Sequence, residues 1–286
     1  MTATATRTGL PQSVGPGAFA VADRQASERS LRGWLKQTWV LTVRQLLVVC
    51  REWPILAQII LMPAVTMLMF KVVLGDVVGE ATGTDSAFGT VPLIILVSAM
   101  NGSMVAAVKL NLERQNGVLA RLWVMPINRM ADFSSRLAAE ALRIVITTAV
   151  LVAAGHLIGF RFTQGVGPAI GLFAVAVVFG LAFAVLTLAL AVNLPAGVPV
   201  ALYLSLLMTL LMFFNSGFCP IDQYPGWLQP IVANQPMTPA IDAMRAMAAG
   251  GPLAADLWKV AGWAAGIAAV LGYPALRGYR RAAVGR

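Results

Sequence analysis

Charged side chains that could do chemistry gather in one stretch of an otherwise apolar sequence. Residues 113–129 read Glu-Arg-Gln-Asn-Gly-Val-Leu-Ala-Arg-Leu-Trp-Val-Met-Pro-Ile-Asn-Arg. Glu113, Arg114 and Arg121 supply charge, and Pro126 would end a helix. The apolar residues near helical spacing are Leu112, Leu119, Leu122 and Trp123. Because charge is costly in hydrocarbon, the stretch is expected at a membrane surface, where its chemistry would be the docking of a soluble partner. An ordinary cytoplasmic loop would show the same pattern.

The other candidates for chemistry are isolated, and neither a catalytic residue nor a metal site is predicted. The sequence has no Gly-Lys pair, so binding of ATP phosphates by a P-loop is excluded. His156 is the single histidine, and no group of His, Cys, Asp or Glu has metal-ligand spacing. Glu140 and Arg143 are a close ionisable pair near the inner end of an apolar segment, and we interpret them as a structural or interfacial pair.

Composition indicates a membrane protein. Of the 286 residues, 58% are hydrophobic and 12% are charged, whereas soluble domains carry about 25% charged residues. The net charge of +9 comes from basic residues scattered around apolar segments, which favours membrane topology over nucleic-acid binding. Cys50 and Cys219 are expected on opposite sides of the membrane and do not suggest a disulfide.

The predicted fold is an all-α integral membrane domain with six transmembrane helices. Apolar segments of roughly 20 residues can cross the hydrocarbon. The spans are expected at about 55–74, 91–108, 137–158, 168–192, 198–218 and 255–276. Small residues at four-residue spacing predict close helix packing. These are Ser98, Gly102 and Ala106, the pair Gly155 and Gly159, and the pair Gly262 and Gly266.

Three further segments flank or interrupt the spans. Residues 1–30 are predicted to be a disordered cytoplasmic tail, and 31–286 the transmembrane domain. Residues 31–50 place a basic arc beside a Trp-bearing apolar arc, which predicts a helix at the cytoplasmic interface, although an extension of the first span would look similar. Residues 219–252 are rich in proline yet apolar, which favours external re-entrant helices.

The distribution of basic residues predicts that both termini are cytoplasmic. With six spans in this orientation, only Lys71, Arg161, Arg245 and Lys259 of the 21 Lys and Arg residues fall outside. Cytoplasmic loops carry the excess of basic residues in membrane proteins. The stretch at 113–129 then lies on the cytoplasmic side.

No energy source for transport is evident within the chain. A secondary transporter keeps a coupling carboxylate near mid-membrane, whereas the polar residues here are Asn101, Thr209 and Asn215. An energising partner is therefore expected. A proton-coupled secondary exporter, a lipid-modifying membrane enzyme and a membrane scaffold subunit are the rival hypotheses.

Two regions of the sequence resemble the permeases of the ABC-2 family. One is 113–129, continuing through Ser135-Arg136-Leu137 to Gly159-Phe160-Arg161-Phe162. The other runs from Asn215-Ser216-Gly217-Phe218-Cys219-Pro220 through Tyr224-Pro225-Gly226-Trp227 and Asn234-Gln235-Pro236 to Ala243-Met244-Arg245. The runs at 119–126 and 157–162 are similar to the daunorubicin/doxorubicin-resistance (Drr) type, in particular to mycobacterial C-type permeases. Many family members have Gly-Thr where this chain has Gly117-Val118.

The resemblance implies a type V exporter fold, with a cytoplasmic coupling helix at 112–127 and re-entrant helices that cap the exit. It implies a multi-pass protein of the cell membrane, surrounded by membrane lipids. This chain would work with two copies of an ATPase that bind ATP and Mg, and with a second permease, either a sister chain or itself. The chain itself would hold no cofactor and would not be an enzyme. Substrates would be large hydrophobic compounds, either anthracycline-like drugs or envelope lipids such as phthiocerol dimycocerosates.

The resemblance and the apolar spans together assign candidate residues to three roles. The expected ATPase contact comprises Glu113, Arg114, Gly117, Leu119, Arg121, Leu122 and Pro126. The expected external cap includes Pro220, Pro225, Trp227, Pro236 and Arg245. Flexible side chains in the second and fifth spans are expected to line the substrate path, because methionine adapts to varied ligands. These are Met100, Met104, Met208, Met212 and Phe213, for which plain helix packing is the alternative.

Overall fold

The computed structural model describes residues 31–51, 53–82, 86–117, 129–194, 198–217 and 219–284, and these residues contain helices and no strand. The long helices are α1 (Leu31–Arg51), α2 (Trp53–Thr82), α3 (Ala87–Gln115), α5 (Arg129–Leu157), α6 (Val166–Asn193), α7 (Val200–Phe213) and α10 (Ala254–Val284). The short ones are the 3₁₀ helix η2 (Ile221–Gln223), α8 (Gln229–Asn234) and α9 (Met237–Ala249).

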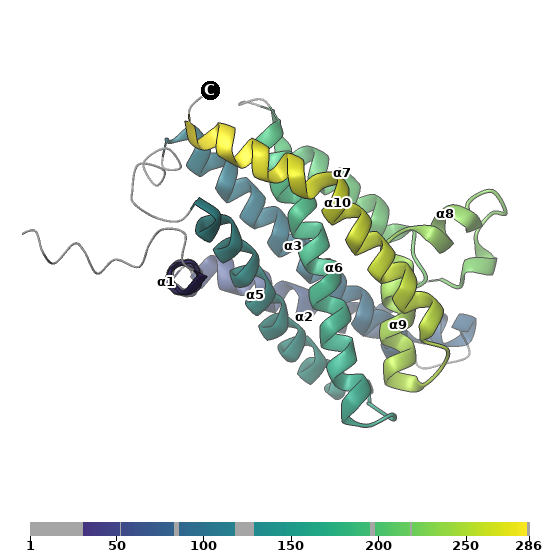
Figure 1. Ribbon diagram of the computed structural model, residues 1–286. Coiled ribbons are helices and arrows are strands. Elements are labelled where there is room, and N and C mark those ends of the chain that lie inside the picture. The colour runs from purple at the N-terminus through teal and green to yellow at the C-terminus, as the bar shows by residue number, and fades with distance from the viewer. Residues whose placement is uncertain are drawn as a thin grey trace, which may run out of the picture.

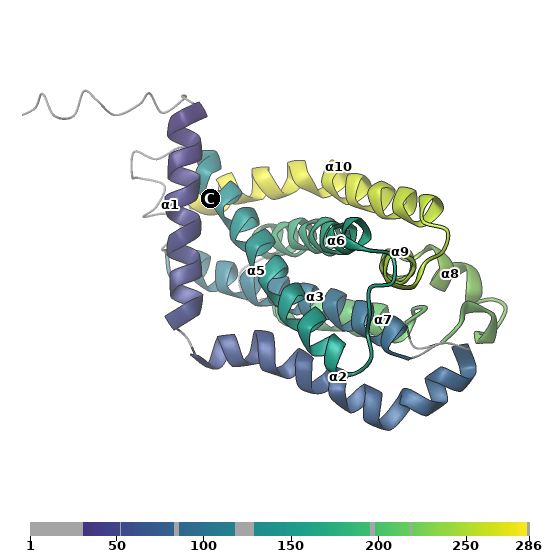
Figure 2. The ribbon, with the colours of Figure 1, turned by 90° about the horizontal axis from the view of Figure 1, so that it is seen from below.

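Helices α2, α3, α5, α6, α7 and α10 run between the same two ends of the molecule (Figures 1 and 2). Helix α1 crosses one end of this bundle, whereas α8 and α9 lie at the opposite end. We call these the α1 end and the α9 end. The predicted order of apolar helices is therefore present, with the predicted interfacial and proline-rich segments at opposite ends.

Four helices of the described chain are long and apolar enough to cross a membrane. They are Ala87–Gln115, Ala131–Leu157, Val166–Asn193 and Ala254–Gly278. Two shorter apolar helical stretches, Ile60–Val73 and Val200–Phe213, lie in α2 and α7. The predicted all-helical membrane fold thus agrees with the length and composition of the helices.

Helix α7 is shorter than the span predicted at 198–218, because polar contacts end it early. Its 14 residues extend about 21 Å at 1.5 Å per residue, less than the hydrocarbon thickness of roughly 30 Å. The Asn215 side-chain amide donates to the carbonyl oxygens of Leu211 and Met212, and its Oδ1 accepts from the Gly217 amide at 2.7 Å. These contacts satisfy groups that a helix end leaves without partners.

Helix α6 forms the centre of the bundle and packs against α3, α5, α9 and α10. It has no charged residue, and side chains such as Leu172, Phe179 and Phe183 are buried in the main apolar core. Gly180 permits the close approach, because a Cβ there would overlap Ile144 of α5 and lie 3.2 Å from the Ala99 Cβ of α3. Small residues at helix contacts allow this packing within a membrane.

Most of helix α9 is buried among α3, α6 and α10 rather than exposed to a lipid phase. Met237, Ile241 and Met244 have no exposed surface, and a Cβ at Gly171 of α6 would lie 2.9 Å from the sulfur atom of Met247. A short helix can lie at membrane depth when protein surrounds it. The proline-rich segment thus contributes to the core at the α9 end.

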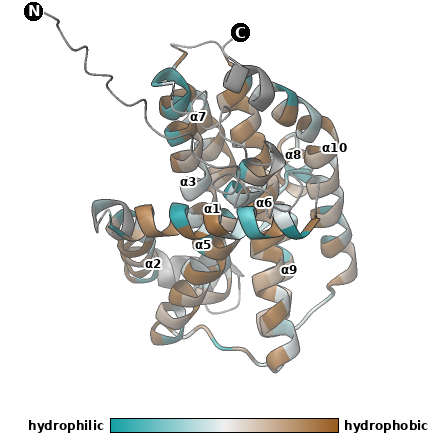
Figure 3. Cartoon of the chain, turned by 60° about the vertical axis from the view of Figure 1, so that its left-hand side comes forward, coloured by the Kyte–Doolittle hydropathy of each residue, from teal (hydrophilic) through white to brown (hydrophobic). Residues whose placement is uncertain are grey.

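Large apolar side chains remain exposed on the outer faces of the bundle, especially on α2, α7 and α10. Figure 3 shows hydrophobic residues over these helices, whereas α1 carries both hydrophilic and hydrophobic residues. An exposed apolar surface of this extent is suited to lipid or to another membrane chain.

The small residues predicted to permit close packing divide into two groups. A Cβ on Gly102 would overlap the guanidinium group of Arg143, and one on Gly155 would lie 3.1 Å from Val91 Cγ2. Gly262 and Gly266 of α10 have no neighbouring atom of the described chain within 4 Å of the same position. The first group packs α3 and α5, and the second faces outward.

We predict that Gly102→Ala destabilises the chain by about 1–3 kcal/mol, because the new methyl group must displace the guanidinium group of Arg143. Gly262→Ala is the matched control, since its methyl group meets open space. Thermal unfolding of the purified chain in detergent should give a lower midpoint for Gly102→Ala only. Equal midpoints for the two variants would contradict the packing described for Gly102.

Candidate functional site

The predicted docking stretch begins at the last turn of α3, where Glu113 is held by α5. Glu113 Oε2 lies 2.7 Å from Arg136 Nη2, and Arg136 Nε lies 3.3 Å from Asp132 Oδ2. One guanidinium group therefore bridges a carboxylate on α3 and a carboxylate on α5. This geometry fixes the end of α3 relative to the beginning of α5, because the planar guanidinium group binds carboxylates in a defined orientation.

Arg114 connects the same end of α3 to α6. Its Nη1 donates to the carbonyl oxygen of Leu194 at 2.9 Å and to that of Ala191 at 3.4 Å. Carbonyl oxygens at a helix C-terminus lack partners within the helix and carry partial negative charge, which an arginine complements. Neighbouring residues of the predicted ATPase contact thus fasten α3 to two different helices.

The docking stretch leaves α3 through a tight turn. The Asn116 amide donates to the Leu112 carbonyl oxygen at 2.9 Å, and Gly117 adopts φ 69°, a conformation that glycine favours. Residues 112–115, predicted as the start of a separate coupling helix, continue α3. The remaining predicted contact residues, Leu119, Arg121, Leu122 and Pro126, lie outside the described residues.

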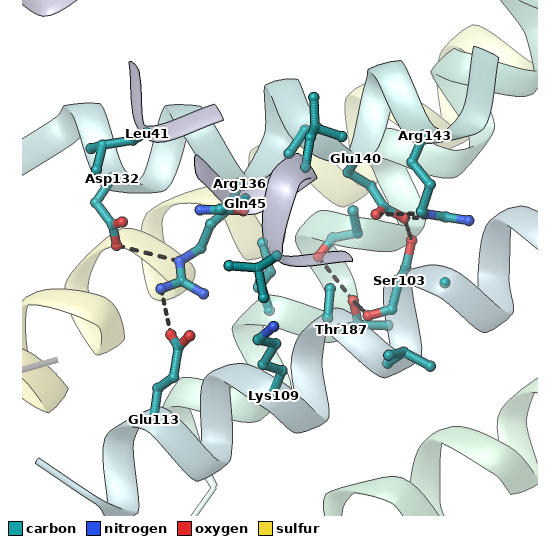
Figure 4. Close-up of a pocket in the computed structure, with 18 of the residues that line it drawn as sticks. Leu41, Gln45, Ser103, Lys109, Glu113, Asp132, Arg136, Glu140, Arg143 and Thr187 are labelled. Carbon is teal, nitrogen blue, oxygen red and sulfur yellow. Dashed lines mark hydrogen bonds and ion pairs between the residues drawn. The ribbon is translucent and has the colours of Figure 1, made fainter. Parts of the chain in front are cut away.

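A cavity of about 240 Å³, lined by both ionic and apolar side chains, lies at the α1 end between α1, α3, α5 and α6. Figure 4 shows the side chains of Leu41, Gln45, Ser103, Lys109, Glu113, Asp132, Arg136, Glu140, Arg143 and Thr187 around it. The cavity was not predicted, because its walls come from residues far apart in the chain, from Leu41 to Leu188. Its ionic groups adjoin the predicted docking stretch.

Glu140 and Arg143 form a buried ion pair in one wall of this cavity. Arg143 Nε donates to Glu140 Oε2 at 3.0 Å, and Arg143 Nη2 donates to the Ala99 carbonyl oxygen at 3.0 Å. Ser103 Oγ donates to Glu140 Oε1, so the carboxylate contacts α3 as well. The pair that the sequence indicated is therefore a link between α5 and α3.

Sequence reasoning missed most of the cavity residues, although part of the signal was present. Asp132 and Arg136 are spaced i, i+4 in one helix, which predicts an ion pair. The contacts of Glu113 with Arg136 and of Ser103 with Glu140 join different helices. Such contacts depend on how α3 and α5 are aligned.

A second cavity, of about 230 Å³, forms a groove between α2 and α3. Its walls include Met62, Pro63, Ile94, Val97 and Met104, and its polar residues are Gln58, Thr66, Ser98 and Asn101. Asn101 is exposed, and the buried Ser98 Oγ has no hydrogen-bond partner within the described residues. An apolar groove with a few polar groups is the usual form of a small-molecule site.

The residues predicted for the substrate path occupy different environments. Met104 lies in the α2–α3 groove, whereas Met100 has no exposed surface and packs in the core. Met208 is also buried, Met212 is half-buried, and Phe213 is 59% exposed. Met104 is thus the predicted path residue that the structure places at a cavity.

At the α9 end, Arg245 joins the residues that follow α7 to α9. Its Nη2 donates to the Ser216 carbonyl oxygen at 2.8 Å, and its Nη1 lies 3.3 Å from Asp242 Oδ1. Ser216 Oγ donates to the same carboxylate at 2.8 Å. Burial raises the pKa of Asp242, against the lowering effects of the Ser216 hydrogen bond and the Arg245 charge.

The other predicted cap residues lie around this cluster. Pro220 and Pro225 flank η2, and Tyr224 Oη between them donates to the Asn215 carbonyl oxygen at 3.0 Å. Trp227 is 73% exposed, and Pro236 precedes α9. The proline-rich segment is therefore tied to the end of α7 by side-chain contacts.

Comparison of the sequence with known protein families identifies the family of this chain. The model for ABC-2 type transporters matches residues 36–248, which extend from α1 to α9. The chain belongs to the ABC-2 type transporter family. The predicted resemblance is thus confirmed.

Curated relatives of this ABC-2 chain are drug-resistance permeases. The probable doxorubicin resistance ABC transporter permease protein DrrC of Mycobacterium tuberculosis is 37% identical over 256 residues, in strains CDC 1551 / Oshkosh and ATCC 25618 / H37Rv. The aligned part covers 90% of this chain and 92% of DrrC. The daunorubicin resistance ABC transporter permease protein DrrB1 of Streptomyces coeruleorubidus is 27% identical over 267 residues, covering 92% of this chain and 91% of DrrB1.

Membership of the ABC-2 family establishes the general role of the chain. It is an integral multi-pass membrane protein and the permease subunit of an ABC transporter. ATP is handled by a separate ATPase subunit with which such a permease works. The ionic cluster at the α1 end therefore belongs to a transport protein that has no nucleotide site of its own.

We predict that Arg143→Leu destabilises this permease by about 3–5 kcal/mol, because it leaves the Glu140 carboxylate buried without a counter-charge. The double variant Glu140→Leu/Arg143→Leu removes both charges and should recover most of that loss. Thermal unfolding in detergent measures both effects. Equal instability of the single and double variants would attribute the loss to packing rather than to charge.

Proposed function

We propose that this chain is the permease of an ATP-driven exporter for large hydrophobic compounds, either anthracycline-like drugs or envelope lipids such as phthiocerol dimycocerosates. In this proposal α2, α3, α5, α6, α7 and α10 cross the cell membrane, and both termini are cytoplasmic. The α1 end then faces the cytoplasm and the α9 end faces outward. The relatives named for doxorubicin and daunorubicin resistance support the choice of substrate class.

The observation that carries the proposal is the groove between α2 and α3. Its apolar walls suit a hydrophobic ligand, and the exposed Asn101 amide can hydrogen-bond to the few polar groups of such a ligand. The Ser98 hydroxyl adds a second polar group, which has no partner within the described chain. A polar atom in an apolar groove orients a ligand that apolar contacts alone would leave free to rotate.

The size of the groove supports pairing with a second permease. Drug-sized ligands occupy pockets of about 300–1,000 Å³, and this groove provides about 230 Å³. Leu61, Val65 and Leu68 of α2 are each about half exposed, although they are apolar. A second permease, either another copy or a sister chain, would complete the cavity and cover this surface, with one ATPase copy for each permease.

The contacts at the α1 end suggest how an ATPase would drive the permease. The docking stretch lies between Glu113 and Arg129, and both of its flanks are fastened to the bundle. Glu113 binds Arg136 of α5, and Arg114 binds the end of α6. A displacement of the stretch by the ATPase would therefore move α3, α5 and α6 together, which is the rigid-body motion that alternating access requires.

We predict that Glu113→Arg abolishes most substrate-stimulated ATPase activity of the assembled complex, because it places a positive charge beside Arg136 and reverses the charge at the dock. Asp132→Asn is the matched control, since it weakens the other carboxylate contact of Arg136 at a more buried residue that is not itself part of the docking stretch. That control should retain coupling. Unchanged coupling in Glu113→Arg would overturn the role given to Glu113.

We predict that Asn101→Leu lowers drug transport about tenfold, the effect of losing one polar contact worth about 1.4 kcal/mol. Thr209→Val is the control, because Thr209 is exposed on α7 and its hydroxyl donates to the Ser205 carbonyl oxygen of the same helix. Doxorubicin uptake into inverted proteoliposomes that contain the complex measures the effect. A tenfold loss in both variants would argue against a specific contact at Asn101.

A further inference from the structure

We propose that the cavity beneath α1 binds the headgroup of an anionic phospholipid from the leaflet in which α1 lies. This lipid would be a bound component of the permease rather than the exported compound. The inference therefore goes beyond the proposed function and does not depend on it. It rests on the depth of the cavity, its charge and its apolar wall.

The depth of the cavity matches that of lipid headgroups. Helix α1 lies across the end of the bundle and does not run along the helices that are long enough to span (Figure 2). A helix in this orientation, with basic and apolar sides, lies at the boundary between headgroups and acyl chains. The cavity is lined by Leu41, Arg44 and Gln45 of this helix and therefore lies at the same level.

The position of α1 over the cavity is fixed by hydrogen bonds to α5. Thr42 is buried, and its Oγ1 donates to the Thr38 carbonyl oxygen at 2.7 Å and to the Ser135 carbonyl oxygen at 3.4 Å. Gln45 Nε2 donates to Ser135 Oγ at 3.3 Å. These hydrogen bonds hold α1 against α5 and therefore fix the shape of the cavity between them.

The balance of charge around the cavity leaves one positive charge in excess. Its lining contains the basic residues Arg44, Lys109, Arg136 and Arg143 and the acidic residues Glu113, Asp132 and Glu140. The carboxylates are bound by Arg136 and Arg143 at hydrogen-bond distance. These two guanidinium groups balance two of the three carboxylate charges, and Lys109 balances the third in number, so the positive charge in excess is that of Arg44.

Arg44 is the residue best placed to bind such an anion. It is exposed at the edge of the cavity, and within the described chain it makes no hydrogen bond or ion pair. A guanidinium group binds phosphate oxygens through two parallel hydrogen bonds. At this depth the phosphate group of a lipid is the anion at highest local concentration.

The rest of the lining favours a lipid over a free anion. Val48 of α1, Val105 and Ala106 of α3 and Leu188 of α6 give the cavity an apolar wall beside its ionic groups. A soluble phosphate would leave this wall without a partner. A phospholipid would place its phosphate at Arg44 and its glycerol and first acyl carbons against the apolar wall, which buries apolar area from water.

The test uses the full-length chain, purified in mild detergent and stripped of lipid. The chain is mixed with equal amounts of dioleoyl phosphatidylglycerol and dioleoyl phosphatidylcholine, and native mass spectrometry counts the lipid that stays bound. Arg44→Gln is compared with Arg32→Gln, a change of the same type on the same helix at an exposed residue outside the cavity lining. A separate arm adds a large excess of inorganic phosphate.

We expect the wild-type chain and Arg32→Gln to retain phosphatidylglycerol over phosphatidylcholine by about tenfold, which is the effect of one charge-assisted contact. Arg44→Gln should lose this preference.

Excess inorganic phosphate should not displace the lipid. Equal retention of the two lipids, or equal loss in both variants, would overturn the site. Displacement by inorganic phosphate would overturn the assignment to a lipid. Because Arg44 is exposed and makes no hydrogen bond or ion pair within the described chain, its replacement should leave folding intact, and the thermal midpoint checks this.

Discussion

Ionised side chains inside a helix bundle in lipid need an opposite charge at hydrogen-bond distance, because hydrocarbon cannot solvate them. This permease meets the constraint with two clusters that both join α3 to α5. Arg143 binds Glu140 and lies against Gly102, where a Cβ would overlap the guanidinium group. Arg136 binds Glu113 and Asp132 about two helical turns closer to the α1 end. The alignment of α3 with α5 follows from these charges as much as from apolar packing.

The same constraint is relevant to the proposed action of an ATPase on the bundle through the docking stretch. A charged segment must leave the hydrocarbon. The first residues of this segment lie in the last turn of α3, and they bind to two neighbouring helices. Glu113 reaches α5 and Arg114 reaches the carbonyl oxygens at the end of α6. A force on the segment is thereby shared among the helices that form the core, since α6 packs against both α3 and α5. The ABC-2 chain needs no internal energy source if an ATPase supplies that force.

The two ends of the bundle use polar residues for different purposes. At the α1 end, ionic groups surround a cavity that is partly lined by α1. At the α9 end, Asn215, Ser216 and Arg245 end α7 early and hold α9 within the core. Between the two ends, the α2–α3 groove is mostly apolar, with Asn101 as an exposed polar group.

The sequence by itself determined the class of protein and the order of its helices, because hydropathy and helical spacing are local properties of the chain. It also indicated Glu140 with Arg143, whose i, i+3 spacing needs only one helix, and the family to which the motifs at 113–129 belong. Only the tertiary structure decided that Met100 is buried, that Gly262 and Gly266 face outward, and that Glu113 binds Arg136. Those outcomes depend on the rotation of each helix about its axis and on its alignment with neighbours. Both are set by contacts between residues far apart in the chain, which no local pattern contains.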